Sequence, residues 1–383
     1  MTACGEVWHG GQATSAPVVR LPPDVLPSDP AEITPQWLTA ALGHRVAGQA
    51  GLAAIRVDRV GSGRGHIGSS FRARLTYHDR PDGAPDSVVV KLPALTAESR
   101  RTAQRGRLYE REVRFFSELA DGVDVGAPRC FAAGHDPASD RFALVLADMT
   151  GRRHVDQLDG CPVELAELAL RRLARTHARW WGDERLVDLP WLTTFSNPNR
   201  VSNLLGLGNT GWPLLCDALA GRVGQRARGI GDAVIGLLPK AMARLDDLPQ
   251  SLLHGDPRLD NLMFDAGAAR VPVVLLDWQN ASRGAAASDV CYFLVQNLSM
   301  DDFRDHRADL LDSYHRELVV SGVAGLSLAD LTGSLPLVLP VVFAVAASLF
   351  VVGDRHEVRT AELAAVMAER ALSAAEQIGM PVA

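Results

Sequence analysis

The sequence has few cysteines, and they do not follow a pattern that binds metal or forms a disulfide framework. The five are scattered, odd in number and never spaced as C-x-x-C: Cys4, Cys130, Cys161, Cys216 and Cys291. We therefore expect neither a zinc site nor structural disulfides. This usage suits a reducing compartment, and the stretch MTACGEVWHGGQATSAP lacks the basic and apolar segments of a signal peptide. We accordingly expect a cytoplasmic protein.

Positive charge is also scarce. The 39 Lys and Arg residues are outnumbered by 45 Asp and Glu, which gives a formal net charge of −6, and no basic run stands out. Because nucleic-acid binding depends on concentrated positive charge, we expect no nucleic-acid partner. The apolar share of 47% and the charged share of 22% are those of an ordinary globular protein. A length of 383 residues suits two lobes.

One uncharged segment, LPLVLPVVFAVAASLFVV at residues 335–352, is long enough to span a membrane. Pro336 and Pro340 interrupt it, and no cluster of Lys or Arg flanks it. Membrane helices usually carry such flanking charges, so we expect a buried core helix and no membrane association.

The expected elements of the first part of the chain are mostly strands. Residues 1–32 are rich in Gly, Pro and Ala and should form a flexible leader. A helix should follow at ITPQWLTAALG, where Thr34 is a suitable N-cap, Pro35 lies in the first turn and Gly43 ends the helix. Alternating or β-branched runs then predict strands at residues 55–60, 70–78 and 87–93.

The rest of the chain changes in character. A polar helix at SRRTAQRGRLYEREVRFFSELA precedes two strands, one around Cys130 and one at FALVLADM. From about residue 162 the pattern is mostly helical, with VPVVLLDWQ as an isolated strand. This order predicts an α+β, bilobal protein. Residues 33–150 would form a small antiparallel-sheet lobe that binds nucleotide, and residues 151–383 a larger helical lobe for catalysis and acceptor binding.

The stretch LLHGDPRLDNLMF, residues 252–264, contains the spacing H-G-D-x-x-x-x-N, and Asp277 follows at the end of the apolar run VVLLD. Phosphoryl transfer needs one carboxylate to orient a hydroxyl and accept its proton. It also needs a second carboxylate and an amide oxygen to hold Mg²⁺ against nucleotide phosphates. Asp256 would be the base, and Asn261 and Asp277 the metal ligands. Each residue alone could merely cap a turn, but the joint spacing favours catalysis.

Three residues near this motif are candidates for other roles. His254 is expected to brace the loop by hydrogen bonds, and Asp289 in AASDVCYFL is expected to brace it from the start of a helix. Arg258 could reach the transferring phosphate and offset its charge, which would make it part of the catalytic set. It could equally pair with the nearby Asp260, and the sequence leaves both roles open.

A glycine-rich stretch, GSGRGHIGSS, lies upstream at residues 61–70. Gly63, Gly65 and Gly68 form G-x-G-x-x-G, but a strand follows them instead of the helix of a dinucleotide-binding fold. Glycines between two antiparallel strands allow backbone amides to close over phosphates. We place Ser69 with these glycines as a nucleotide contact.

Lys91 stands among valines in VVVKLP, where an unpaired ammonium would be costly. Phosphate oxygens and a helix carboxylate would both serve as its partners. Glu112 in YEREVRFF is the best candidate for the carboxylate, and Glu110 is the rival. The alternative is an exposed lysine on an edge strand.

The strand LVLADM should lead out of the first lobe. Its backbone from Ala147 to Met149 would meet the adenine of the nucleotide, while Asp148 is either a hinge contact or a helix cap. His177 lies on the apolar side of the helix LARTHARWWGD and is predicted to be a core residue instead of a catalyst.

Together, GSGRGHIGSS, VVVKLP, EREVRFF, HGDPRLDNLMF, LLDWQ and SDVCYFL resemble the aminoglycoside phosphotransferase and choline kinase group, which shares the protein-kinase-like fold. ITPQWLTAAL, LDWQ and LARTHARWW are most similar to its ecdysteroid-kinase-like and acyl-CoA-dehydrogenase-associated branches. The resemblance covers about residues 33–320 and implies ATP and Mg²⁺ as cofactors and phosphorylation of a small-molecule hydroxyl. By this likeness the base is Asp256, the metal ligands are Asn261 and Asp277, and Lys91 pairs with Glu112.

Two positions depart from the family pattern. The tip of the glycine loop holds His66 and Ile67 where relatives often have an aromatic or bulky residue, and Ala147 stands where they often have Glu. Neither departure removes a catalytic group. A non-catalytic nucleotide-binding scaffold remains the alternative of a different class, but it would be signalled by loss of Asp256 or Asp277, and both are present.

The acceptor pocket should draw on residues 192–230 and 290–350. These segments lack a dense group of carboxylates apart from Asp301, Asp302 and Asp305. A polycationic aminoglycoside would need several acidic partners, so the sequence favours a neutral or partly apolar alcohol. Phosphorylation of an aminoglycoside or another antibiotic is the second possibility.

Overall fold

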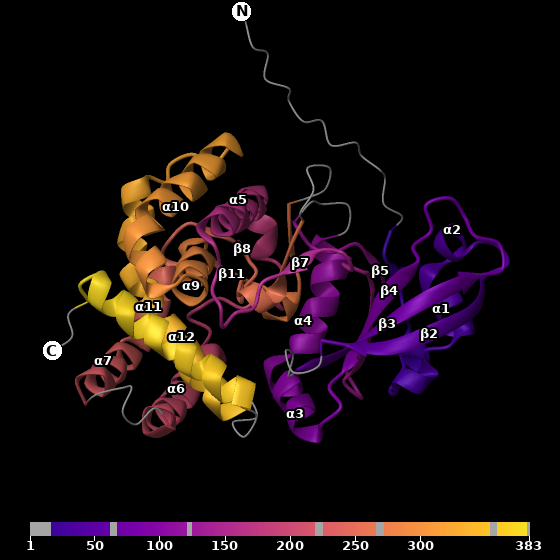
Figure 1. Cartoon of the computed structure of the whole chain (residues 1–383), viewed down its shortest axis with the longest axis horizontal. Coiled ribbons are helices and arrows are strands. Elements are labelled where there is room, and N and C mark those ends of the chain that lie inside the picture. Colours follow the sequence, from indigo (N-terminus) through magenta and orange to yellow (C-terminus); the bar gives the residue numbers. More distant parts are fainter. Residues whose placement is uncertain are drawn as a thin grey trace, which may run out of the picture.

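The computed structural model describes residues 17–61, 67–120, 125–218, 225–265, 272–352 and 358–380. Gly63, Gly65 and His66, which belong to the predicted nucleotide loop, lie outside the described residues, as do residues 1–16. Figure 1 shows a sheet-rich part on one side of the molecule and a larger helical part on the other. We call these the N-terminal and C-terminal lobes.

The N-terminal lobe is built on a six-stranded sheet with the order β1-β5-β6-β4-β3-β2. Its strands are β1 (Val19–Arg20), β2 (Leu52–Val60), β3 (Gly68–Tyr77), β4 (Ser87–Pro93), β5 (Cys130–Asp136) and β6 (Arg141–Ala147). All neighbours pair antiparallel except β1, which is parallel to β5. The five strands expected from the sequence in this part are therefore confirmed, and β1 is an addition.

The predicted flexible leader is wrong for residues 17–32. This stretch adds β1 to the edge of the sheet and continues into two short 3-10 helices, η1 (Pro23–Val25) and η2 (Pro30–Glu32). Leu21 and Leu26 are buried in the core of the lobe, and Arg141 donates a hydrogen bond to the carbonyl oxygen of Leu26 at 3.2 Å. Prolines between the two leucines restrict the unfolded chain, so ordering this stretch costs less conformational entropy.

Two helices cover one face of the sheet, α1 (Pro35–Leu42) and α2 (His44–Ala47). The predicted caps of α1 are confirmed: the hydroxyl of Thr34 accepts a hydrogen bond from the amide of Trp37 at 3.1 Å, and Gly43 ends the helix with φ 67°. The apolar residues of these helices share one core with Val88, Val90 and Leu92 of β4, so Lys91, which alternates with them, faces away from this core.

Where the sequence predicted one polar helix, the structure has three pieces: α3 (Ala97–Gly106), α4 (Leu108–Arg114) and a π-helical turn, η3 (Phe115–Leu119). Arg107 separates α3 from α4 because its backbone is left-handed, with φ 51°. After this break α4 lies against the other face of the sheet, where the ring of Tyr109 stacks on Phe142 with centroids 4.1 Å apart.

The C-terminal lobe is mostly helical, and the predicted bilobal α+β class is confirmed. Its main helices are α5 (Val163–Arg179), α6 (Pro198–Ala218), α7 (Gln225–Gly236), α8 (Leu238–Asp246), α9 (Ala287–Asn297), α10 (Met300–Val320), α11 (Leu328–Val352) and α12 (Val358–Gln377). The predicted boundary at residues 149–151 falls between β6 and the first strand of this lobe, β7 (Arg153–His154).

Short strands and turns inside the C-terminal lobe carry the sequence motif. They are β8 (Gln250–Leu253), η5 (Leu259–Asn261), β9 (Leu262–Phe264), β10 (Val273–Leu275), η6 (Trp278–Asn280) and β11 (Ser282–Ala285), with η4 (Glu184–Leu186) earlier in the chain. The prediction that VPVVLLDWQ is an isolated strand is wrong, because β10 pairs with β9 and β9 with β7. With three residues, β9 is too short to show an alternating pattern.

Within the described residues, α11 is the one helix that is long and apolar enough to cross a membrane, with a mean hydropathy of 2.6. It packs against α6, α8, α9 and α12. In its most apolar stretch of 18 residues, 61% is buried inside the protein. The prediction of a core helix for residues 335–352 is confirmed.

Candidate active site

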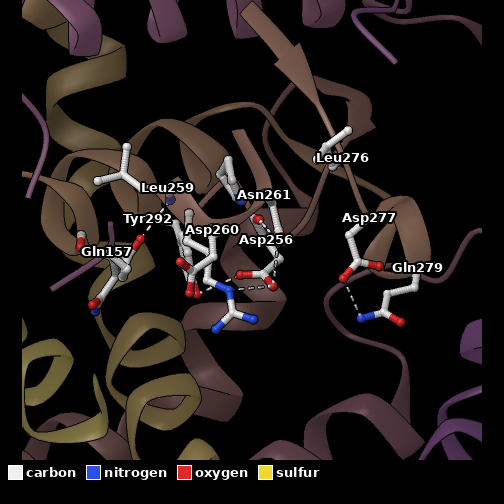
Figure 2. A network of polar contacts seen from close by, with 12 residues as sticks. Gln157, Asp256, Leu259, Asp260, Asn261, Leu276, Asp277, Gln279 and Tyr292 are labelled. Carbon is white, nitrogen blue, oxygen red and sulfur yellow. Dashed lines mark hydrogen bonds and ion pairs between the residues drawn. The ribbon is translucent and has the colours of Figure 1, made fainter. Parts of the chain in front are cut away.

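Two strand pairs bring the motif residues together. β8 leads into the loop of Asp256 and pairs with β11, where Leu253 lies opposite Ser282. β9 follows Asn261 and pairs with β10, which ends just before Leu276 and Asp277. The two pairs therefore hold the loop beside the segment that follows β10. Figure 2 shows Asp256, Asn261 and Asp277 projecting from these neighbouring segments.

Gly255 lets the two segments approach closely. Its φ is +81°, a region that L side chains rarely adopt, and a Cβ atom there would lie 2.3 Å from the carbonyl oxygen of Asn280. Only glycine combines this backbone conformation with such a contact. The glycine of the H-G-D motif thus serves the packing of the catalytic loop against residues 278–281.

Asp289, at the start of α9, holds the loop by its backbone, which is the contact predicted from the sequence. Its Oδ2 accepts from the amide of His254 at 2.7 Å and its Oδ1 from the amide of Gly255 at 3.0 Å. His177 is fully buried, as predicted for a core residue, and its Nε2 lies 3.3 Å from Oδ2 of Asp289. Burial acts to raise the pKa of Asp289, but these hydrogen bonds lower it below its ordinary value.

The ring of His254 joins the loop to the segment of Leu276 and Asp277. Its Nε2 lies 2.7 Å from the carbonyl oxygen of Leu276, and its Nδ1 accepts from the amide of Asp256 at 3.3 Å. A carbonyl oxygen can only accept, so Nε2 carries the proton and Nδ1 is free to accept. Both ring nitrogens are satisfied in the neutral form, which agrees with a bracing role.

The carboxylate of Asp256 is surrounded by donors. Oδ1 accepts from the hydroxyl of Tyr292 at 2.9 Å, and Oδ2 accepts from Nδ2 of Asn261 at 3.1 Å. Nε of Arg258 lies 3.4 Å from Oδ2, so the ion pair of this arginine is with Asp256. The alternative partner, Asp260, lies 3.5 Å from Arg359 instead.

Asn261 and Asp277 offer the oxygen atoms that a hard cation prefers. Because Nδ2 of Asn261 is engaged by Asp256, the amide oxygen is the atom left for a metal. The carbonyl of Asn261 accepts from the amide of Leu276 at 2.8 Å, which ties the two ligand segments together. No group of three or more His, Cys, Asp or Glu side chains in the described residues could hold a metal alone. The amide oxygen of Asn261 and the carboxylate of Asp277 are of the ligand type that Mg²⁺ prefers, so the two residues fit this ion.

Lys91 connects the two lobes. Its Nζ donates to both carboxylate oxygens of Glu112, at 2.8 and 2.7 Å, and to Oδ1 of Asp277 at 2.6 Å. Burial acts to lower the pKa of Lys91, but the charges of Asp277 and Glu112 outweigh it and raise the pKa above its ordinary value. The rival partner Glu110 pairs with Arg107 and Arg114, and β4 lies inside the sheet, so the edge-strand alternative is excluded.

The backbone of Asp277 is left-handed, with φ 62° and ψ 64°. Non-glycine residues rarely adopt this conformation, and the packing of the next residue holds it here. The buried ring of Trp278 stacks on Phe115 with centroids 3.9 Å apart, and its Nε1 donates to the carbonyl of Leu275 at 3.0 Å. This packing anchors the segment that presents Asp277 to Lys91.

Of the predicted glycine-loop residues, the structure describes Gly68 and Ser69. A Cβ atom at Gly68 would lie 3.0 Å from Cε of Lys91, so this glycine passes close to the lysine. The nucleotide contact of Ser69 stays a prediction: Ser69 pairs with Leu92, whose side chain lies in the core under α1, whereas Ser70 pairs with Lys91. Successive side chains of a strand point to opposite faces, so Ser70 shares the face of Lys91.

The exit from β6 carries the predicted adenine contacts. The amide of Ala147 donates to the carbonyl of Arg129 at 2.8 Å, and the carbonyl of Met149 accepts from the amide of Arg152 at 3.1 Å. Both residues lie at the lobe connection, but these two backbone groups are already engaged. Asp148 accepts from Nε of Arg72 at 2.7 Å, which makes it a hinge contact with β3.

Sequence reasoning missed several residues that position the catalytic loop. The amide of Leu259 donates to Oε1 of Gln157 at 2.7 Å and to Oδ1 of Asn297 at 3.0 Å, and Figure 2 includes Gln157 in this network. Tyr292 had a detectable signal, because it stands three residues after Asp289 and so on the same side of α9. Gln157 had none, since it lies 102 residues before its partner.

Comparison with known proteins agrees with this geometry. Residues 218–322, which include the loop, Asp277, Asp289 and Tyr292, match the model of the ecdysteroid kinase-like family. No curated protein sequence matches the chain.

Solved structures share the fold along most of the chain. A protein from Ralstonia eutropha JMP134, named as an aminoglycoside phosphotransferase, is 20% identical with a TM-score of 0.53, and the match covers 89% of this chain and 97% of that one. Choline kinase from Cryptosporidium parvum Iowa II is 9% identical with a TM-score of 0.55, covering 86% and 91%. An amicoumacin kinase is 12% identical with a TM-score of 0.53, covering 85% and 89%.

The chain has the aminoglycoside phosphotransferase and choline kinase-like fold. The family resemblance expected from the sequence is thereby confirmed, both by the family match over residues 218–322 and by the shared fold. At identities of 20% or less, the solved structures establish the fold of this kinase-like chain and not its substrate.

Proposed function

We propose that the protein is a small-molecule kinase that transfers the γ-phosphoryl group of ATP to a hydroxyl, with Mg²⁺ as cofactor. The observation that carries this proposal is the contact of Lys91 with Asp277 at 2.6 Å. It joins the phosphate-binding lysine of one lobe to the metal ligand of the other, beside a loop that holds a carboxylate and an amide. Phosphoryl transfer requires this combination.

Asp256 would act as the base. Its carboxylate orients the acceptor hydroxyl and takes its proton, while the hydroxyl oxygen forms a bond to the γ-phosphorus and the bond to the bridging oxygen of ADP breaks. Arg258, held against Asp256, would offset charge on the transferring group. The side chain of Asp256 is 14% exposed, which keeps bulk water largely away from it.

Asn261 and Asp277 would hold the metal, and Lys91 would bind phosphate oxygens. A bound Mg²⁺ ion neutralises charge that develops between the phosphates. Glu112 positions the lysine for this contact through two hydrogen bonds. The amicoumacin kinase of the same fold was solved with AMP-PNP and Ca²⁺, which supports a nucleotide and a divalent cation here.

A polycationic acceptor is not favoured. Two members of the acidic group noted in the sequence are engaged with a cation on the exposed surface of α10, where Arg304 pairs with Asp301 at 2.7 Å and with Asp305 at 2.8 Å. Relatives of this fold include proteins named for aminoglycosides and for choline, so the fold does not select the acceptor. We therefore propose an acceptor that is not polycationic.

The decisive test is the Asp256→Ala variant, with Asp309→Ala as the control because Asp309 is an exposed carboxylate on α10. Loss of a general base should reduce kcat by about 100- to 10,000-fold. The shift in melting temperature on adding MgATP should persist, because Lys91 and Asp277 remain. Assays would use a panel of alcohols, sugars and aminoglycosides. Equal kcat in both variants would refute the role of Asp256, and no product with no MgATP shift in the wild type would refute the kinase proposal.

A further inference from the structure

Buried polar atoms without a partner gather on the segment that follows Asp277. Three side chains of residues 279–288 are more than nine-tenths buried and keep an oxygen that has no hydrogen bond to any described residue: Gln279 (Oε1), Ser282 (Oγ) and Ser288 (Oγ). Native proteins pair nearly all such groups, so a local concentration of unpaired ones points to a ligand. The segment lies beside the base, because Gly255 packs directly on Asn280.

Two arginines from other elements lie near this segment, one in direct contact with it and the other through a phenylalanine ring. Arg111 on α4 donates from Nη1 to the carbonyl of Gln279 at 3.1 Å. The guanidinium of Arg200, at the start of α6, stacks over the ring of Phe195 at 4.3 Å, and this ring lies against Gly284. Each arginine has a buried nitrogen without a partner, Nε in Arg111 and Nη1 in Arg200.

Among the residues that the structure describes, no carboxylate is dedicated to balancing the charges of these two arginines. Burial lowers the pKa of Arg200 to about 10, and burial together with the charge of Arg200 does the same for Arg111, so both remain cations at neutral pH. The carboxylates closest in effect to the two arginines already have other partners. Glu110 pairs with Arg107, and Asp246 accepts from the amides of residues 195 and 196. Asp289 accepts from the amides of His254 and Gly255. Both side chains are half-buried, and withdrawing a cation from water without a counter-ion costs free energy.

We propose that Arg111, Arg200 and the segment 279–288 bind the acceptor, and that the acceptor carries a carboxylate or phosphate group in addition to the hydroxyl that is phosphorylated. Guanidinium groups present paired N–H donors that match the oxygens of either anion. The inference rests on the proposed kinase function, and it replaces the neutral alcohol favoured by the sequence with an anionic one. An aminoglycoside would be repelled by the same charges.

The first test compares matched acceptors in the wild-type enzyme: hydroxy acids with their methyl esters, and phosphorylated diols with the free diols. We expect the anionic member to have a kcat/KM at least about 10-fold higher, and the two pairs distinguish a carboxylate from a phosphate. Arg200→Met should remove most of this preference and leave the MgATP melting shift unchanged. Arg304→Met, an exposed arginine on α10, is the matched control. Better turnover of neutral or cationic acceptors would overturn the proposal.

The second test does not depend on turnover. Sodium sulfate is titrated calorimetrically into the Lys91→Met protein, in which the lysine that would bind nucleotide phosphates is absent. Sulfate should bind, and the additional change Arg200→Met should weaken binding by about 10- to 100-fold, the range for a hydrogen bond to a charged group. Binding that is absent, or unaffected by Arg200→Met, would overturn the anion site. Arg200-dependent binding without turnover of any acceptor would instead support the anion site and count against the kinase proposal.

Discussion

Tyr292 offers the sharpest test of how the base is positioned. Its hydroxyl donates to Oδ1 of Asp256 at 2.9 Å, and its side chain is only 5% exposed. Burial and the charge of Asp256 raise the pKa of Tyr292 well above its ordinary value, so the hydroxyl keeps its proton and remains a donor. Tyr292→Phe removes this donor and leaves the ring in place.

The size of the effect follows from the contacts that remain. A hydrogen bond to a charged group contributes about 1.5–3 kcal/mol. Asn261 and Arg258 still hold the other oxygen of Asp256, so the lower end of that range applies. Since about 1.4 kcal/mol corresponds to a factor of ten, kcat should fall about 10-fold. The KM for ATP should not change, because Tyr292 has no contact with Lys91 or Asp277.

Steady-state phosphorylation kinetics at varied ATP measure both constants. Tyr77→Phe is the control, because the hydroxyl of Tyr77 bonds to the carbonyl of Pro85 in a turn of the N-terminal lobe. A kcat for Tyr292→Phe equal to that of the wild type would show that the hydroxyl does not position the base. A rise in the KM for ATP instead of a fall in kcat would show that its role lies in nucleotide binding.

Two further substitutions test the loop. Gly255→Ala should abolish activity and lower the free energy of unfolding by more than the roughly 1–2 kcal/mol of left-handed strain, because its Cβ would also meet Asn280. Gly322→Ala is the control, because Gly322 also has a positive φ but has open space around its Cα. Chemical denaturation of both variants separates backbone strain from steric overlap. Equal losses in the free energy of unfolding would contradict the close packing of Gly255 on Asn280. The second substitution concerns Asp289, whose pKa in the folded protein lies below the ordinary value of 3.8. Its ionised carboxylate therefore stabilises the fold above pH 3.8, and this stabilisation is lost as the pH falls through the folded pKa. Asp289→Asn should therefore lower the melting temperature at pH 7 and flatten its decline in acid, whereas a curve parallel to the wild type would disprove this.

Local chemistry made much of the site visible in the sequence. The spacing of His254, Asp256 and Asn261 lies within one loop, and Asp277 ends a short apolar run, so the residues proposed as base and metal ligands could be recognised together. The caps of α1 were equally readable, because Thr34 and Gly43 act on a helix only a few residues away. Alternation along β3 and β4 revealed the strands, but only their pairing showed that Ser70 shares the face of Lys91, because a shift of one residue reverses the face.

The sequence by itself determined which chemical groups are present and how they are spaced, since spacing within a loop, strand or helix is set by backbone geometry. Tertiary structure alone decided the choice of Glu112 over Glu110, the bond from Tyr292 to Asp256, and the packing of residues 17–32 on the sheet. Lys91 meets Asp277 across 186 residues of chain. Contacts between residues so far apart in the chain form only when whole helices and strands pack together. Such packing produces no local pattern in the sequence from which the contact could be predicted.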